Sequence, residues 1–304
     1  MLITEKFRVK QQLSSAEQAV ADFLLANGRD LDRYSTRDLA DSAYTSPATV
    51  IRLCKKLGFS GFDDFKQRFL DEQRYLEKRA GVVDANFPFE HGDSPVRAAN
   101  RIGQLYNDAV SDTLSLLHHS DLQKATRLLS RCRRAYVFSF GTALNQAETF
   151  RENMMKIGKG VSISNNLNYQ LYECECLSSG DLAICISYSG ETEKLLHIAK
   201  TCHERHVPII GITSYGENSL TEYVDCKLTL STKEALFDNA ATFGTHISVC
   251  LLLDILYASL FLTDFDANYE RRVSSTRELE AKRRSANELL MAEASYTERR
   301  EDGG

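Results

Sequence analysis

The stretch DLAICISYSGETEKLLHIAKTCHER, residues 181–205, decides the fold of the larger part of this chain. It opens on an apolar run over 181–187, which predicts a buried strand, and continues into a helix expected over 190–205. Four further apolar runs share this strand pattern: 135–140, 160–164, 208–213 and 226–230. Because helical segments separate them, the pattern predicts an α/β domain in which helices flank a parallel five-stranded sheet on both faces.

The turn SYSGET at Ser187–Thr192 lies where the predicted strand ends and the helix begins, and ligands of parallel sheets bind at such ends. Gly190 allows close backbone approach, and the free N–H groups of a first helical turn suit an anion. Ser187, Ser189 and Thr192 add three hydroxyl donors. The turn has no Lys, which excludes a Walker phosphate loop and favours a small phosphate monoester over a magnesium nucleotide. The alternative is an ordinary helix N-cap with spare hydroxyls.

Length and charge predict two domains and two kinds of surface. The chain has 304 residues, enough for two cores, and a net charge of −5. Residues 1–80 carry 14 Lys+Arg against 12 Asp+Glu, whereas the remainder carries 23 against 30. A basic-leaning head on an acidic body suits a polyanionic partner.

Two features predict a cytoplasmic protein without a membrane span. The start, MLITEKFRVKQQ, has no apolar signal core. The most apolar stretch, 248–262, contains Asp254 and is shorter than the ~20 residues that a bilayer span needs, so we expect a buried helix there. The eight cysteines include no CxxC pair and most lie in apolar runs, so we expect most of them to be free buried thiols and expect neither a metal site nor a disulfide framework.

Helix start signals are dense in the first 80 residues. Ser14 and Ser35 each begin a capping-box pattern, and Ser46-Pro47 is a third start signal. These signals predict a helix over 36–42, a tight turn, and a second helix over 47–57 that ends at Gly58. Two short helices joined by such a turn form a helix-turn-helix, whose second helix enters the major groove of DNA.

The helix over 47–57 has one apolar face, formed by Val50, Leu53, Cys54 and Leu57, and an opposite face of small and basic residues. Arg and Lys can bind phosphates or the guanine edge, and Thr and Ala methyls can contact thymine. The alternative is a merely solvated basic face. The candidate DNA-contacting residues are Ser46, Ala48, Thr49, Arg52, Lys55 and Lys56.

The stretch YSTRDLADSAYTSPATVIRLCKKLGFSGFDDF, residues 34–65, resembles the N-terminal helix-turn-helix of RpiR-type bacterial transcription regulators. The run RLCKKLGFSGF carries most of that resemblance. The family usually has Gly in the turn where this chain has Tyr44. If the turn requires a positive φ at that position, Tyr44 carries strain.

The segment 135–230 resembles a sugar isomerase (SIS) domain, a phosphosugar-binding module whose S-x-S-G-x-T loop holds the phosphate. The resemblance implies a second phosphate loop after the first strand, where Ala143 replaces the usual Ser; the lost hydroxyl is worth ~1.5–3 kcal/mol if it contacts a charged phosphate. Three consequences are open: the affinity for a phosphosugar is lower, or Thr142 or Ser139 supplies the missing hydroxyl, or the ligand is a different one. No cofactor is implied. The implied ligand-binding residues are Gly141, Thr142, Ser187, Tyr188, Ser189, Gly190, Thr192 and Glu234.

We expect four segments. These are a helix-turn-helix domain over 1–80, a linker over 81–95, the SIS domain over 96–270 and a polar helical tail over 271–304. From residue 270 onward the chain carries 8 basic and 8 acidic residues, with a thin apolar stripe that includes Leu289 and Leu290 and leaves open a partner-binding helix.

Three functions remain possible at this stage. The first, which the order of the two domains favours, is a non-enzymatic regulator that binds operator DNA as a homodimer or homotetramer and senses a phosphorylated sugar. The second is a sugar-phosphate isomerase or lyase, with Glu234 and His246 as acid–base candidates. The third is a regulator that has lost its ligand, an alternative that Ala143 motivates.

Overall fold

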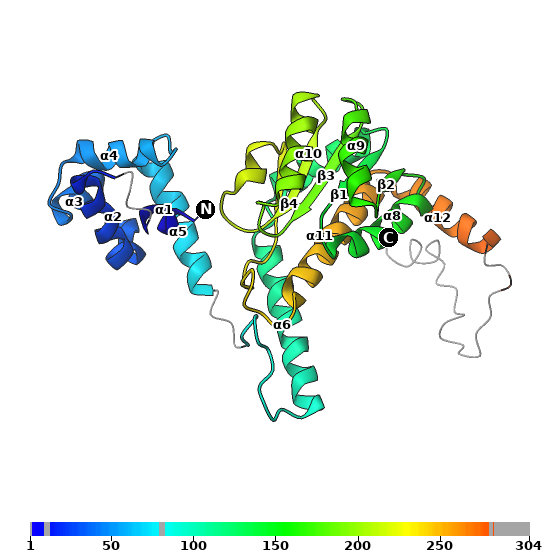
Figure 1. Cartoon of the computed structure of the whole chain (residues 1–304), viewed down its shortest axis with the longest axis horizontal. Helices are drawn as coiled ribbons and strands as arrows, with labels where there is room; N and C mark the ends of the chain where they lie inside the picture. The colour runs from blue at the N-terminus through cyan, green and yellow to red at the C-terminus, as the bar shows by residue number, and fades with distance from the viewer. Residues whose placement is uncertain (1, 9–12, 79–82, 280–281, 283–304) are drawn as a thin grey trace, which may run out of the picture.

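The computed structural model describes residues 2–8, 13–78, 83–279 and 282. Figure 1 shows a helical head, coloured blue to cyan, beside an α/β part that contains the sheet. The fold class predicted from the sequence is confirmed. The helices of the head are α1 (Ile3–Arg8), α2 (Ser15–Asn27), the 3-10 helix η2 (Gly28–Arg33), α3 (Thr36–Ser42), α4 (Pro47–Lys56) and α5 (Phe62–Lys78).

The head folds around aromatic side chains. Phe7, Phe65 and Phe69 are fully buried and lie within about 6 Å of one another by ring centroid, between 5.5 and 6.2 Å. The predicted helix starts are confirmed: Ser14 and Ser35 both form capping boxes. These caps satisfy the backbone N–H groups that a helix leaves unpaired at its N-terminus.

All five strands are parallel, and the sheet has the order β2-β1-β3-β4-β5. Strands β1 and β3 are neighbours, and the chain proceeds outward from them in both directions. The carboxyl ends of β1 and β3 therefore flank the topological switch point, where ligands of such sheets bind. The strands are β1 (Ala135–Phe138), β2 (Val161–Ile163), β3 (Leu182–Ser187), β4 (Ile209–Thr213) and β5 (Cys226–Thr229).

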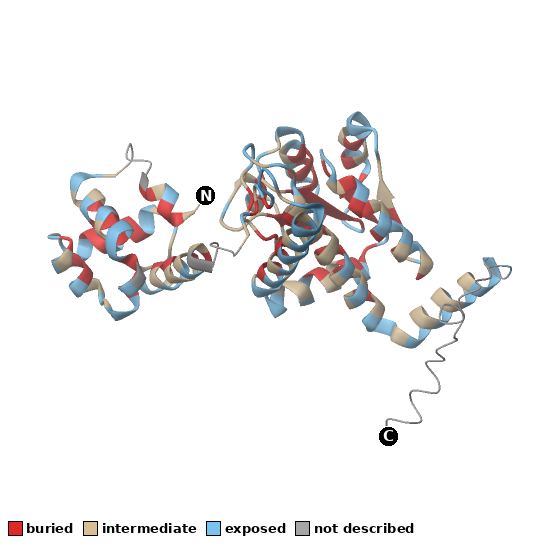
Figure 2. Ribbon diagram, turned by 90° about the horizontal axis from the view of Figure 1, so that it is seen from below, coloured by how far each residue is buried: buried red, intermediate tan, exposed pale blue. Residues whose placement is uncertain are grey.

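Helices cover both faces of the sheet, as Figure 2 shows by the buried residues between the layers. Ile184 and Ile186 of β3 pack with residues of α7, α8 and α11, whereas Ala183 and Cys185 pack with α9 and α10. This alternation follows from the two-residue period of a strand. The helices of this part are α6 (Pro95–Ser115), α7 (His119–Arg131), α8 (Ala143–Lys156), α9 (Leu167–Cys176), α10 (Glu193–Glu204), the 3-10 helices η3 (Ser219–Glu222) and η4 (Leu262–Asp264), α11 (Phe243–Phe261) and α12 (Phe265–Leu279).

The most apolar helix differs in part from its prediction. A buried helix over 248–262 is expected, and α11 begins five residues earlier, at Phe243. By length and composition alone, the run Phe243–Leu279 could span a membrane, which is weak evidence because core helices pass the same test. Val249, Leu252 and Leu256 of α11 belong to the core beneath the sheet.

Helices lie at the predicted boundaries of the linker and of the C-terminal tail, where the structure describes these residues. Helix α5 ends at Lys78 and α6 begins at Pro95, so the expected linker separates two helices. Helix α12 buries none of its described side chains, and Leu289 and Leu290 lie outside the described residues.

All eight cysteines are at described positions and none forms a disulfide. Burial raises the pKa of the Cys202 thiol to about 12, which makes it unreactive.

Candidate functional site

The turn between α3 and α4 has the predicted tight geometry. Thr45 N donates to Ala40 O at 2.8 Å, which folds the end of α3 back toward α4. Tyr44 has a φ of 52° and its side chain is 98% exposed. The strain expected for a Tyr at this position is therefore present, because only Gly adopts positive φ without cost.

Helix α4 begins at Pro47, and its N-cap is Ser46, whose Oγ accepts from Thr49 N at 3.2 Å. Its inner face is buried as predicted, with Val50, Leu53 and Cys54 in the core of the head. These contacts orient the opposite face of α4 toward solvent.

The outer face of α4 contains most of the residues predicted to contact DNA. Ala48, Arg52 and Lys55 are all exposed. Ile51 is 41% exposed on the same helix, and sequence reasoning missed it, although its position one turn after Ala48 and one turn before Lys55 places it beside them. An exposed apolar side chain between basic ones can contact a thymine methyl.

Four of the predicted DNA-contacting residues, Ser46, Thr49, Arg52 and Lys56, make side-chain bonds within the head. Thr49 is 4% exposed, and its Oγ1 bonds Ser46 Oγ at 3.0 Å and accepts from Arg52 at 3.3 Å. Lys56 Nζ lies 3.0 Å from a carboxylate oxygen of the buried Glu17. The backbone N–H of Ser14 and the Lys56 ammonium hold the pKa of Glu17 below its usual value. Lys56 is therefore exposed to solvent, but its ammonium group neutralises the buried carboxylate of Glu17.

The turn that follows β3 is closed by its own hydroxyls. Ser187 Oγ accepts from Gly190 N at 3.1 Å and lies 3.2 Å from Thr192 Oγ1. Ser189 Oγ accepts from Glu191 N at 3.1 Å. The structure thus brings the predicted hydroxyls and the N-terminus of α10 together at the carboxyl end of β3, where they can donate to an anion.

Two features require a glycine at position 190: a positive backbone φ and the close approach of the Asn218 side chain. Its φ is +69°, and a Cβ placed on it would lie 2.1 Å from the side chain of Asn218. Asn218 in turn donates from Nδ2 to Thr213 Oγ1 at 3.0 Å. Asn218 was not singled out from the sequence, because it lies 26 residues beyond the turn and no local pattern marks it.

The loop after β1 is open at its tip and fixed at its base. Gly141 and Thr142 are exposed, and Ala143 begins α8. Ser139 is buried and donates to Ile186 O at 3.0 Å, so its hydroxyl joins β1 to β3 and is not free to substitute for the missing Ser. Gln170 of α9 is fully buried and bonds the backbone of Ser139 in both directions, at 3.1 and 3.2 Å.

The two acid–base candidates have structural partners. Glu234 is 5% exposed, and its carboxylate accepts from Gly244 N at 2.5 Å and Thr245 N at 3.0 Å, so it caps α11. His246 Nδ1 is hydrogen-bonded to Gln146 Nε2, and its Nε2 lies 3.9 Å from Cys250 Sγ. The capping bonds engage both oxygens of Glu234, which leaves it a poor general base.

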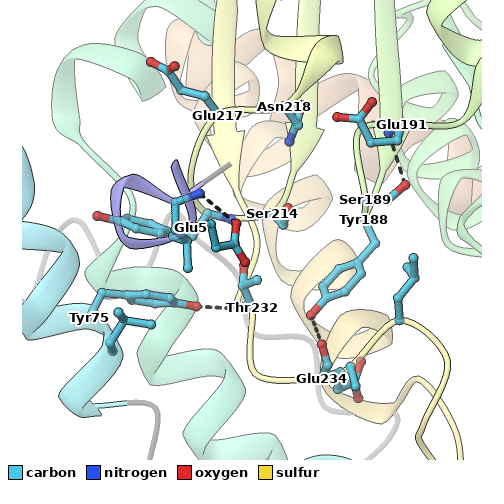
Figure 3. Close-up of a pocket in the computed structure, with 15 residues that line it drawn as sticks. Glu5, Tyr75, Tyr188, Ser189, Glu191, Ser214, Glu217, Asn218, Thr232 and Glu234 are labelled. Atoms are coloured by element: carbon cyan, nitrogen blue, oxygen red, sulfur yellow. Dashed lines mark hydrogen bonds between the residues drawn. The ribbon is translucent and has the colours of Figure 1, made fainter. Parts of the chain in front are cut away.

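A cavity of about 430 Å³ lies beside the turn on the β4 side, within the size range of small-molecule sites. Figure 3 shows that residues of the head and of the α/β part line it together. Among the described residues that line it there are four glutamates and no Lys, Arg or His. Gly141, Thr142, Ser187, Gly190 and Thr192 lie outside its lining. The lining residues are Leu2, Glu5, Tyr75, Leu76, Tyr188, Ser189, Glu191, Ser214, Tyr215, Glu217, Asn218, Thr232, Glu234, Ala235 and Leu236.

Comparison with known proteins identifies the class. The model of the rpiR-family helix-turn-helix domain matches residues 1–74, and the SIS domain model matches 128–259. An HTH-type transcriptional regulator of Haemophilus influenzae is 25% identical over 250 residues, which are 82% of this chain and 86% of that protein. The chain belongs to the RpiR family: it is a transcriptional regulator with a DNA-binding helix-turn-helix domain and a SIS domain. The resemblance seen in the sequence is confirmed.

Solved structures share the fold. Vibrio vulnificus NanR, complexed with ManNAc-6P, superposes with a TM-score of 0.58 at 21% identity and covers 93% of this chain and 99% of its own. The sugar isomerase domain of an RpiR transcription factor from Sphaerobacter thermophilus gives a TM-score of 0.52 at 15% identity, over 60% of this chain and 98% of its own.

Proposed function

We propose that α4 binds in the major groove of operator DNA and that a phosphorylated sugar, bound at Ser187–Thr192, changes the affinity for that DNA. The observation that carries the proposal is one chain in which a groove-sized helix exposes Arg52 and Lys55 while a turn of hydroxyls stands at a helix N-terminus. The exposed basic helix suits a polyanion such as DNA, and the hydroxyl turn suits a small anion such as a phosphate group.

The effector half draws further support from a related structure. NanR shares this fold and is complexed with ManNAc-6P. In this chain we place the phosphate of the effector against the turn, with its sugar toward the cavity. Four glutamates line that cavity, so its chemistry suits hydroxyl or amino groups of a sugar better than a second phosphate.

The DNA half is tested by a strand-resolved footprint on the DNA upstream of the protein's own gene, followed by anisotropy titrations. Arg52→Ala should weaken specific binding by about 1–3 kcal/mol if Arg52 contacts a base edge. Equal weakening on operator and unrelated DNA, with a shallower salt dependence, would instead assign Arg52 to phosphate. Unchanged binding to both DNAs would remove α4 from the interface.

The effector half is tested by adding sugar phosphates to the protein–operator complex and by melting the protein with each. A ligand at 100 times its dissociation constant adds ~2.7 kcal/mol of stability. Flat melting curves and unchanged operator affinity across the panel would support the second candidate, a regulator without a ligand. Two observations favour that candidate: Ala143 supplies no hydroxyl, and the hydroxyls of Ser187 and Thr192 bond each other.

We propose no catalytic role, because Glu234, the better-placed acid–base candidate, is held by the N-terminus of α11. Measurable aldose–ketose turnover by the purified protein would overturn this. We also propose the domain division expected from the sequence, a cytoplasmic location and a homo-oligomer. Exposed apolar side chains such as Val96, Leu114 and Leu262 support self-association. Light scattering on the protein as it elutes from a size-exclusion column gives its molar mass and so tests the oligomeric state.

A further inference from the structure

The segment 231–242, which joins β5 to α11 and is called the connecting loop here, contacts the effector turn, the head and the linker at once. We propose that this loop transmits effector binding to the head, and that Tyr75 is the positioning residue that joins the head to it. The inference rests on the proposed function, since it concerns regulation of the same effector site.

The effector end of this connection runs through Tyr188. Tyr188 lies inside the SYSGET turn, and its hydroxyl donates to Glu234 O at 2.7 Å. Glu234 caps α11 with its carboxylate. A displacement of the turn therefore moves the backbone of the connecting loop, because the hydrogen bond from Tyr188 to Glu234 O joins the two.

The head end of the connection runs through Tyr75 on α5, the last helix of the head. Tyr75 is 7% exposed, and its hydroxyl accepts from Thr232 N at 2.8 Å. Its ring stacks on Tyr215 of the loop after β4, with centroids 4.2 Å apart and planes 21° apart. The tyrosine thus inserts between two loops of the α/β part, and Figure 3 shows its hydroxyl pointing to Thr232.

The linker contacts the same loop. Asn86 Oδ1 accepts from Ala235 N at 2.6 Å, and Asn86 O accepts from Ala240 N at 2.8 Å. The last helix of the head, α5, and the linker are therefore both hydrogen-bonded to the loop that the effector turn holds.

The cavity provides a direct reason for the coupling. Tyr75 and Glu5 of the head line it opposite Tyr188 and Ser189 of the turn. A sugar that binds the turn from this side occupies space against the head, so its affinity depends on where the head lies. A ligand with different affinity for two positions of the head must change their populations, and coupling is reciprocal, so DNA binding must also change the effector site.

The test uses the full-length protein with operator DNA and ManNAc-6P, glucosamine 6-phosphate or ribose 5-phosphate as the added probe. Tyr75→Phe keeps the ring stack and removes the hydroxyl. We expect operator affinity without probe to stay within about 2-fold of the wild type, and the change that the probe causes, about 5- to 150-fold for ordinary allosteric coupling, to fall below 2-fold. Probe binding to each variant is measured separately by calorimetry.

Asn86→Ala is the second variant and should reduce the coupling in the same direction. Tyr136→Phe, a half-buried tyrosine on β1, is the matched control and should leave it unchanged. Full coupling in both Tyr75→Phe and Asn86→Ala, with probe still bound, would overturn the inference.

Hydrogen exchange separates failure of the inference from failure of the proposed function. If no sugar phosphate alters operator affinity in the wild type, effector sensing fails, and the connection is then judged without effector. Operator DNA alone should change exchange at the amides of Thr232, Ala235 and Ala240 at least 3-fold in the wild type, and less in Tyr75→Phe. Identical exchange with and without DNA would refute the connection.

Discussion

Replacing Tyr44 by Gly should stabilise the protein, because Tyr44 lies in the turn before α4 with a φ of 52°. The left-handed conformation costs a non-glycine residue about 1–2 kcal/mol. Gly offsets part of this gain, about 0.4–1 kcal/mol, through its greater freedom in the unfolded chain. The side chain is 98% exposed, so its removal sacrifices almost no packing. The expected net gain is about 0.5–1 kcal/mol.

Urea unfolding of the full chain measures this gain, with hydrogen exchange of the α4 amides as a local readout of the head. Tyr44→Ala is the matched control, since it removes the ring and retains the Cβ that makes a positive φ costly. Its stability should stay within about 0.5 kcal/mol of the wild type. The reasoning fails if the Gly variant is no more stable than the wild type, or if the Ala variant gains as much as the Gly variant.

Three further outcomes are expected. Gly190→Ala should destabilise the protein by about 1–2 kcal/mol, seen as a lower melting temperature, because the new Cβ meets Asn218 and the φ is +69°. Lys55→Ala should weaken operator binding in anisotropy titrations more than Lys56→Ala does, because only Lys56 is paired with Glu17; equal losses would contradict this. Since the pKa of Glu17 is lowered on folding, its contribution to stability is present above its unfolded pKa and lost as pH falls through the folded value. Glu17→Gln should remove that part of the acid dependence of urea midpoints, and an unchanged pH profile would refute it.

Local patterns identified most of the elements. Caps at Ser14, Ser35 and Ser46 were predicted because a cap depends on residues three positions apart. Helix α9 was not predicted, because its sequence LNYQLYECEC has no clear apolar period and because the helix is held by bonds from its own Gln170 to the backbone of the distant Ser139.

The DNA-binding face shows where local reasoning ends. The helical period correctly placed Arg52 and Lys55 outward, but it also placed Thr49 and Lys56 near the outer face. Thr49 is buried and Lys56 is paired with Glu17, because α2 packs close to α4 and supplies the carboxylate 39 residues earlier in the chain. A helical period contains no information about the neighbouring helix.

The order of strands and helices, the helix caps and the chemistry of the SYSGET turn follow from residues near one another in the chain, because periodicity, capping and turn geometry are local interactions. The position of Asn218 against Gly190, the capping role of Glu234 and the insertion of Tyr75 beside Thr232 do not. These contacts depend on how the strands pair and on where α5 packs, and both are set by burial of apolar surface between distant segments.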